Sequence, residues 1–191
     1  MAQAVVFLDR DGTINEDFGY IGNPEDVILF DGAASAIKRL NSRGIKVIVV
    51  TNQSGVGRGY FSREALDGVN LRLKELLRLE GASIDGIYSC PHLPEEGCSC
   101  RKPGTGLVER AVTEHTLAGA RSYVVGDKAC DMELAAKVGA RGVLVLTGHG
   151  HGELEKLACQ IDFLADDLKS AVEWIMDDME KEKPLNAKTL R

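Results

Sequence analysis

The sequence predicts an α/β protein with a doubly wound, Rossmann-like parallel sheet. Short apolar runs alternate with amphipathic helical patterns along most of the chain, as in successive βαβ units. Glycine and polar residues follow directly after these runs, where such sheets bind their ligands. Because parallel strands need a crossover between them, helices are expected on both faces of the sheet.

Buried strands are expected where short apolar runs are bounded by turn residues. The first run, residues 5–8, stops abruptly at two aspartates and a glycine. Similar runs follow at residues 46–50, 84–89, 122–125 and 142–146, and a short strand is possible near residues 162–164.

Helices are expected between these runs. The strongest pattern covers residues 62–80, where Ser62 can cap the helix and Gly81 can end it. Its apolar stripe consists of Leu66, Val69, Leu73, Leu76 and Leu77. The other predicted helices span residues 32–43, 107–115, 132–138 and 167–179.

Length and composition are typical of a globular protein. The chain has 191 residues, of which 44% are hydrophobic and 27% charged. We expect residues 1–180 to form one domain. Residues 181–191 mix charges with Pro184 and Asn186, so a disordered tail is expected there.

Charge and targeting signals narrow the classes of partner. The net charge is −6, so no basic surface for nucleic acid is expected. No apolar run approaches the roughly 18 residues of a membrane span, and no secretory signal precedes the first strand. These features predict a cytoplasmic protein without nucleic-acid or membrane partners.

Asp9 and Asp11 are the most informative residues of the chain, because they end the first apolar run. One carboxylate can attack a phosphorus atom while the other moves a proton, with a divalent cation between them. The alternative is a solvated acidic turn that caps the strand.

Three further strand ends carry polar groups. The second strand runs into Thr51, Asn52, Gln53 and Ser54, whose neutral donors could hold phosphoryl oxygens. Arg101 and Lys102 precede the third predicted crossover helix, and Asp127 and Asp131 follow the fourth strand, where oxygen ligands suit Mg²⁺. Taken singly, these segments also fit an ordinary turn, a solvated basic pair and a helix cap.

Four potential zinc ligands lie within one short segment. Cys90, His92, Cys98 and Cys100 could form a tetrahedral, structural Cys₃His site, although free thiols are the alternative. The segment ends directly before Arg101 and Lys102, so a bound Zn²⁺ would clamp the loop that presents this lysine.

The order of acid pair, hydroxyl, lysine and acid at four strand ends resembles the haloacid dehalogenase superfamily of phosphohydrolases. The resemblance implies that Asp9 is the nucleophile, that Asp11 protonates the leaving group and then activates water, and that Thr51 and Lys102 hold the phosphoryl group. It also implies Mg²⁺ bound by Asp9, the main-chain carbonyl of Asp11 and Asp127, with Asp131 in support.

The cysteine-rich loop narrows this resemblance to superfamily members that act on heptose bisphosphates and, more distantly, on histidinol phosphate. It implies removal of the 7-phosphate of D-glycero-D-manno-heptose 1,7-bisphosphate, in ADP- or GDP-heptose biosynthesis. A histidinol-phosphate or other small phosphomonoester phosphatase is the alternative. The implied substrate contacts are Asp17, Gly19, Tyr20, Asn52, Gln53, Ser54, Arg101 and Lys128.

Motif spacing leaves no room for a separate cap domain. The intervals from Asp9 to Thr51 and from Thr51 to Lys102 are filled by predicted helices, strands and the cysteine-rich loop. We therefore expect an open pocket and a monomer, with Arg101 and Lys128 binding a second phosphate. A phospho-accepting receiver domain and a zinc-based interaction module remain as non-enzymatic alternatives.

Overall fold

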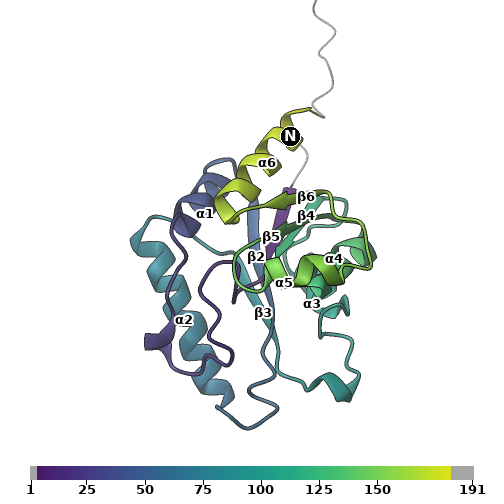
Figure 1. Ribbon diagram of the computed structural model, residues 1–191. Coiled ribbons are helices and arrows are strands. Elements are labelled where there is room, and N and C mark those ends of the chain that lie inside the picture. The colour runs from purple at the N-terminus through teal and green to yellow at the C-terminus, as the bar shows by residue number, and fades with distance from the viewer. Residues whose placement is uncertain (1–3, 182–191) are drawn as a thin grey trace, which may run out of the picture.

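The architecture is a parallel sheet of six strands in the order β3-β2-β1-β4-β5-β6 (Figure 1). The computed structural model describes residues 4–181. The strands are β1 (Ala4–Leu8), β2 (Lys46–Asn52), β3 (Gly86–Cys90), β4 (Arg121–Gly126), β5 (Arg141–Val145) and β6 (Phe163–Ala165). The order reverses between β1 and β4, which is the point where open α/β sheets bind ligands.

Helices cover both faces of this sheet, as the sequence predicts. One face packs against α1 (Ala33–Ser42), α2 (Arg63–Leu79) and α6 (Leu168–Lys181), and the other against α3 (Gly106–Glu114) and α4 (Ala129–Val138) (Figure 1). A short helix, α5 (Gly150–Glu153), follows β5. Ser62 caps α2 by accepting a hydrogen bond from the Ala65 N–H.

Burial on both faces explains the continuous apolar runs of the central strands. In β1, Val6 and Leu8 join the core under α1, α2 and α6, whereas Val5 and Phe7 join the core under α3 and α4. Leu8, the last residue of β1, is in register with Val49 and Val125, so β4 ends one residue and β2 three residues beyond β1 on the same side of the sheet. The residues that follow them therefore gather at one edge.

Two predicted boundaries differ from the structure in an instructive way. Helix α4 begins at Ala129 rather than at residue 132, because Asp131 lies in its first turn and accepts a hydrogen bond from the Lys128 N–H. Strand β2 continues to Asn52, two residues beyond its apolar run. The apolar pattern therefore misses polar residues that belong to these elements.

The predicted tail lies outside the described residues apart from Lys181, which ends α6. Among residues 4–181, no helix combines the length and the apolar character needed to cross a membrane.

An ion-pair cluster around the buried Asp178 ties α6 to the sheet near the amino ends of β4 and β5. Asp178 accepts hydrogen bonds from Arg121 and from the Tyr123 hydroxyl, and its other carboxylate oxygen lies 3.1 Å from Arg141 Nη1. Since Asp178 is buried and these partners come from two strands, the cluster is a structural link between α6 and the sheet.

Candidate active site

The candidate active site lies at the carboxyl ends of β1, β2 and β4, where three buried aspartates meet. Oxygen atoms of Asp9, Asp127 and Asp131 lie within 4.8 Å of one another. All three side chains are buried, and Asp127 is fully shielded from solvent. The sequence predicts that Asp9 and Asp127 both lie at carboxyl ends of strands, and the structure makes these two strands, β1 and β4, neighbours.

Lys102 enters this acidic cluster from the loop after β3. Its ammonium lies 2.9 Å from Asp9 Oδ1 and 2.7 Å from Asp131 Oδ1. Burial alone would lower the pKa of Lys102, but the charges of Asp131 and Asp9 outweigh it and raise the pKa above its usual range. Lys102 is therefore a fixed positive charge beside Asp9.

Burial also shifts the pKa values of the acids. The pKa of Asp127 rises to about 7, mainly through burial and then through the charge of Asp9. Burial raises the pKa of Asp131 to about 6, although the nearby Lys102 opposes the shift. Ionisation of all three carboxyl groups at once is therefore unfavourable in this buried cluster.

Asp11 is held by four hydrogen-bond donors at the edge of the cluster. Arg10 donates from Nε to Oδ1 and from Nη2 to Oδ2, both at 2.9 Å. Asn15 donates to Oδ1 at 2.9 Å, and Gln53 donates to Oδ2 at 2.7 Å and to Thr51 Oγ1 at 2.9 Å. Gln53 thus connects Asp11, at the end of β1, to Thr51, in β2.

Sequence reasoning missed Arg10 and the loop after β5. Arg10 is fully buried although it is charged, and it also donates to Asn70 in α2. Its position between two candidate catalytic acids was a usable signal, because a buried arginine needs acidic partners.

The loop after β5 closes the site from the other side. The His149 N–H donates to Asp127 Oδ2 at 2.8 Å, and Thr147 Oγ1 donates to the Gly12 carbonyl at 2.7 Å. Gly12 and Gly148 both have positive φ, and a Cβ on either would overlap the Asp127 carboxylate. The glycine-rich composition of this loop marked it as close to a site without showing what it contacts.

The predicted substrate contacts fall into two groups. In one group the side chains reach solvent: Tyr20 is exposed, Arg101 and Lys128 are partly exposed, and Lys128 Nζ donates to Asp17 Oδ2 at 2.9 Å. Gly19 is exposed beside them, and its N–H donates to Asp17. The other group lies at the end of β2 and directly after it, and it consists of Asn52, Gln53 and Ser54.

Gln53 donates both side-chain N–H groups to other residues of the protein, Asp11 and Thr51. The side chain of Asn52 makes hydrogen bonds to the main chain of Lys102. Ser54 is buried. These residues therefore shape the floor of the site rather than its opening.

The cysteine-rich loop brings its four predicted ligands together. The sulfur atoms of Cys90, Cys98 and Cys100 lie 3.3–3.6 Å apart, and His92 Nδ1 lies 3.1 Å from Cys100 Sγ and 3.5 Å from Cys90 Sγ. Tetrahedral zinc with these ligands requires separations of roughly 3.5–3.8 Å. The four side chains therefore form a candidate metal centre beside Lys102.

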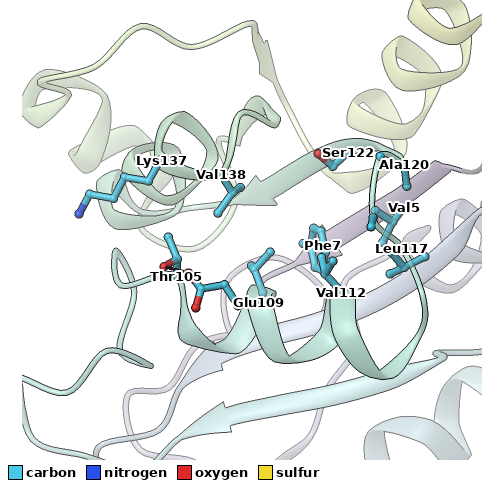
Figure 2. Close-up of a pocket in the computed structure, with 13 residues that line it drawn as sticks. Val5, Phe7, Thr105, Glu109, Val112, Leu117, Ala120, Ser122, Lys137 and Val138 are labelled. Carbon is cyan, nitrogen blue, oxygen red and sulfur yellow. Dashed lines mark hydrogen bonds between the residues drawn. The ribbon is translucent and has the colours of Figure 1, made fainter.

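A separate apolar cavity of about 340 Å³ lies between α3 and α4, against β1 and β4 (Figure 2). Val5, Phe7, Val112 and Leu117 line it, and Glu109 and Lys137 lie at its margin. Val5 and the neighbouring Ser122 lie near the amino ends of their strands, opposite the acidic cluster. This cavity therefore carries none of the chemistry described above.

Comparison with known proteins identifies the family. The D-glycero-D-manno-heptose-1,7-bisphosphate 7-phosphatase of Thermosynechococcus vestitus is 43% identical over 189 residues, covering 92% of this chain and 96% of the relative. The chain belongs to the D-glycero-D-manno-heptose-1,7-bisphosphate 7-phosphatase family.

Other comparisons agree with membership of this heptose-bisphosphate phosphatase family. A Pseudomonas putida D-glycero-beta-D-manno-heptose-1,7-bisphosphate 7-phosphatase is 42% identical, covering 86% of this chain and 94% of the relative. Residues 99–171 match a family model described as HAD-hydrolase-like, which places the family in the haloacid dehalogenase superfamily.

Solved structures of the heptose-bisphosphate phosphatases share the fold. The D,D-heptose 1,7-bisphosphate phosphatase of B. bronchiseptica, complexed with magnesium and phosphate, has a TM-score of 0.86 and 31% identity, covering 92% of this chain and 99% of that chain. The Burkholderia thailandensis D,D-heptose 1,7-bisphosphate phosphatase has a TM-score of 0.71 and 29% identity, covering 91% and 99%.

Proposed function

We propose that this protein is a Mg²⁺-dependent phosphatase that removes the 7-phosphate of D-glycero-D-manno-heptose 1,7-bisphosphate and acts as a monomer. The observation that carries the proposal is the meeting of Asp9, Thr51, Lys102 and Asp127 at one edge of the sheet. The names of the relatives support the choice of substrate.

The acidic cluster fits a divalent cation. Asp127 Oδ1 is buried and has no hydrogen-bond partner among residues 4–181, which is a costly arrangement unless a cation binds there. We assign Mg²⁺ to Asp9, Asp127 and the main-chain carbonyl of Asp11, with Asp131 in support. When bound, Mg²⁺ supplies positive charge that offsets the repulsion between a carboxylate and a phosphate.

In the first proposed step, the Asp9 carboxylate attacks the phosphorus atom of the 7-phosphate. The bond between phosphorus and the sugar oxygen breaks, and Asp11, in its protonated form, gives its proton to that oxygen. Thr51 donates to a phosphoryl oxygen, and the ammonium of Lys102 balances its charge.

In the second proposed step, water cleaves the aspartyl-phosphate. Asp11, now a carboxylate, takes a proton from the water as the water oxygen attacks phosphorus, which releases inorganic phosphate and restores Asp9. Gln53 keeps Asp11 aligned with Thr51 because it donates to both. Arg10 and Asn15 donate hydrogen bonds to the Asp11 carboxylate and so hold its orientation for this step.

The rim of the site supplies the groups proposed to recognise the rest of the substrate. Lys128 lies 3.8 Å from Asp127 Oδ2 and pairs with Asp17, so it borders the site while remaining partly exposed. We assign the rim residues Lys128 and Arg101 to the second phosphate and Asp17, Gly19 and Tyr20 to the sugar, with Ser54 contacting the sugar from the floor of the site.

We also propose that Cys90, His92, Cys98 and Cys100 bind one structural Zn²⁺. The Cys100→Ser variant is then expected to lose the zinc, to melt about 10 °C lower, and to lose activity because Lys102 follows the loop directly. Elemental analysis, thermal unfolding and phosphate release would measure these effects. Cys159→Ser is the matched control, since Cys159 lies outside the cluster; zinc retained in Cys100→Ser would exclude this ligand set.

Magnesium stabilisation is expected to weaken below about pH 7. Burial raises the pKa of Asp127 to about 7 from its ordinary 3.8. A folded-state pKa above the unfolded value means that this group disfavours folding as pH rises from about 4 to about 7. Mg²⁺ would offset the penalty where Asp127 is ionised, whereas protons compete with the metal below that range.

The measurement is the rise in melting temperature caused by Mg²⁺ at about pH 8 and about pH 5.5. We expect the larger rise at the higher pH, and a much smaller pH dependence in Asp127→Asn. Equal rises at both pH values in the wild type would contradict the assignment of Asp127 as a ligand.

Substrate assignment is tested by phosphate release from both anomers of heptose 1,7-bisphosphate and from histidinol phosphate, each with Mg²⁺. We expect kcat/KM to be highest for a heptose bisphosphate. A strong preference for histidinol phosphate would reject the proposed substrate while leaving the phosphatase chemistry intact.

A further inference from the structure

Asn52 makes two hydrogen bonds to the main chain of Lys102. Its Oδ1 accepts from the Lys102 N–H at 3.0 Å, and its Nδ2 donates to the Lys102 carbonyl at 3.1 Å. One side chain thus engages both polar main-chain groups of a single residue that lies 50 positions away in the sequence. Such a pair fixes the position and the orientation of the Lys102 backbone together.

The same asparagine also lies at the start of the cysteine-rich loop. Asn52 is the last residue of β2 and is in register with Cys90, the last residue of β3. The next residue, Gln53, donates its N–H to the Cys90 carbonyl at 2.7 Å. The end of β2 therefore holds the loop where it leaves the sheet, at Cys90, and where it returns, at Lys102.

Lys102 requires such a restraint because its long side chain must reach a defined point. Its ammonium lies between Asp9 and Asp131 at ion-pair distance from both. A lysine side chain is flexible, so the backbone position decides whether the ammonium reaches both carboxylates. Displacements of about 1 Å at a catalytic group can cost about a hundredfold in rate.

We propose that Asn52 is a positioning residue that sets the Lys102 ammonium beside Asp9, rather than a contact of the sugar. The inference rests on the proposed phosphatase function and adds a residue that acts through Lys102. Because both polar ends of the Asn52 amide bind the Lys102 backbone, loss of the amide releases the lysine without removing any group from the reacting atoms.

The test compares Asn52→Ala with wild type on heptose 1,7-bisphosphate and on p-nitrophenyl phosphate, an ester without a sugar. We expect kcat to fall about tenfold to a hundredfold, by the same factor on both substrates, with the KM for the heptose substrate within about threefold. A rise in KM without a change in kcat, or a defect confined to the sugar substrate, would overturn the proposal in favour of a sugar contact.

A double-mutant cycle with Lys102→Met isolates the mechanism. If Asn52 acts through Lys102, Asn52→Ala should reduce kcat no further in the Lys102→Met background. If the fold-decreases in kcat of the two single variants multiply in the double variant, the proposal is overturned. A kcat within twofold of wild type in Asn52→Ala alone would also overturn it.

If the alanine variant does not fold, Asn52→Asp provides the comparison. This variant keeps the acceptor for the Lys102 N–H and should show a smaller decrease in kcat on both substrates.

Asn41 offers a matched control, because it makes the same pair of bonds far from the site. Its Nδ2 donates to the Ser83 carbonyl at 3.1 Å, and its Oδ1 accepts from the Ser83 N–H at 2.8 Å. Asn41→Ala should lower the melting temperature about as much as Asn52→Ala but leave kcat unchanged.

The same assays separate failure of this inference from failure of the proposed function. A wild-type protein without phosphatase activity would count against the proposed function. An active wild type together with an unchanged kcat in Asn52→Ala would count against this inference alone.

Discussion

Asp9→Asn is expected to lower kcat for heptose 1,7-bisphosphate by about 10⁵-fold or more. The amide has nearly the same shape as the carboxylate but cannot attack phosphorus, so the covalent route is lost. The change also removes one of three crowded carboxylates from the cluster. Phosphate release, sampled at fixed times with a high concentration of the variant, would measure the residual rate.

The fold should survive this substitution, which separates catalysis from stability. Asp178→Asn is the matched control, because Asp178 is also buried but anchors α6 through Arg121 and Tyr123. We expect Asp178→Asn to cost about 2 kcal/mol in the free energy of unfolding and to keep wild-type kcat. Hydrolysis by Asp9→Asn at a rate near wild type would refute the nucleophile assignment.

Lys102→Met should impair both activity and stability. The ammonium leaves a buried position between Asp9 and Asp131, and we expect kcat to fall about 10³-fold. At neutral pH and without metal, the free energy of unfolding should fall by about 3 kcal/mol, because two buried carboxylates lose their partner. Urea unfolding with and without Mg²⁺ would measure the second effect.

The pH dependence of this loss has a defined sign. Burial already raises the pKa of Asp131 to about 6 in the presence of Lys102, and removal of that cation should raise it further. The penalty is present where the acids are ionised in the folded protein, and it fades as pH falls toward about 4. Lys137→Met, at an exposed lysine of α4, is the control. A stability loss that persisted undiminished at acidic pH would contradict the ion-pair explanation.

Much of the fold, and the four strand ends that carry candidate catalytic residues, could be predicted from the hydrophobic pattern of the sequence. Buried parallel strands are apolar on both faces, so a strand that stops at Asp9 or Asp127 leaves a clear mark in the hydrophobic pattern. Carboxyl ends of parallel strands share one edge, so these residues are expected on the same side of the sheet, and the adjacency of β2, β1 and β4 then brings them close together. The order itself was not predicted, because short apolar runs do not specify their neighbours.

The contacts of the polar side chains could not be predicted in the same way. Asn52 and Gln53 follow an apolar strand like typical ligand-binding residues, yet their amides bind Lys102, Asp11 and Thr51. An amide group bonds equally well to a substrate or to a main chain, so residue type alone cannot decide. Arg10 was missed for a related reason, since burial of its guanidinium depends on acidic and amide partners supplied by the fold.

The most direct test of the central claim is a crystal structure of the protein with Mg²⁺ and beryllium fluoride, which mimics a phosphoryl group on a carboxylate. We predict beryllium bonded to a carboxylate oxygen of Asp9, with its fluorides facing Thr51 and Lys102. Beryllium bonded to Asp11, Asp127 or any other residue would contradict the proposed chemistry.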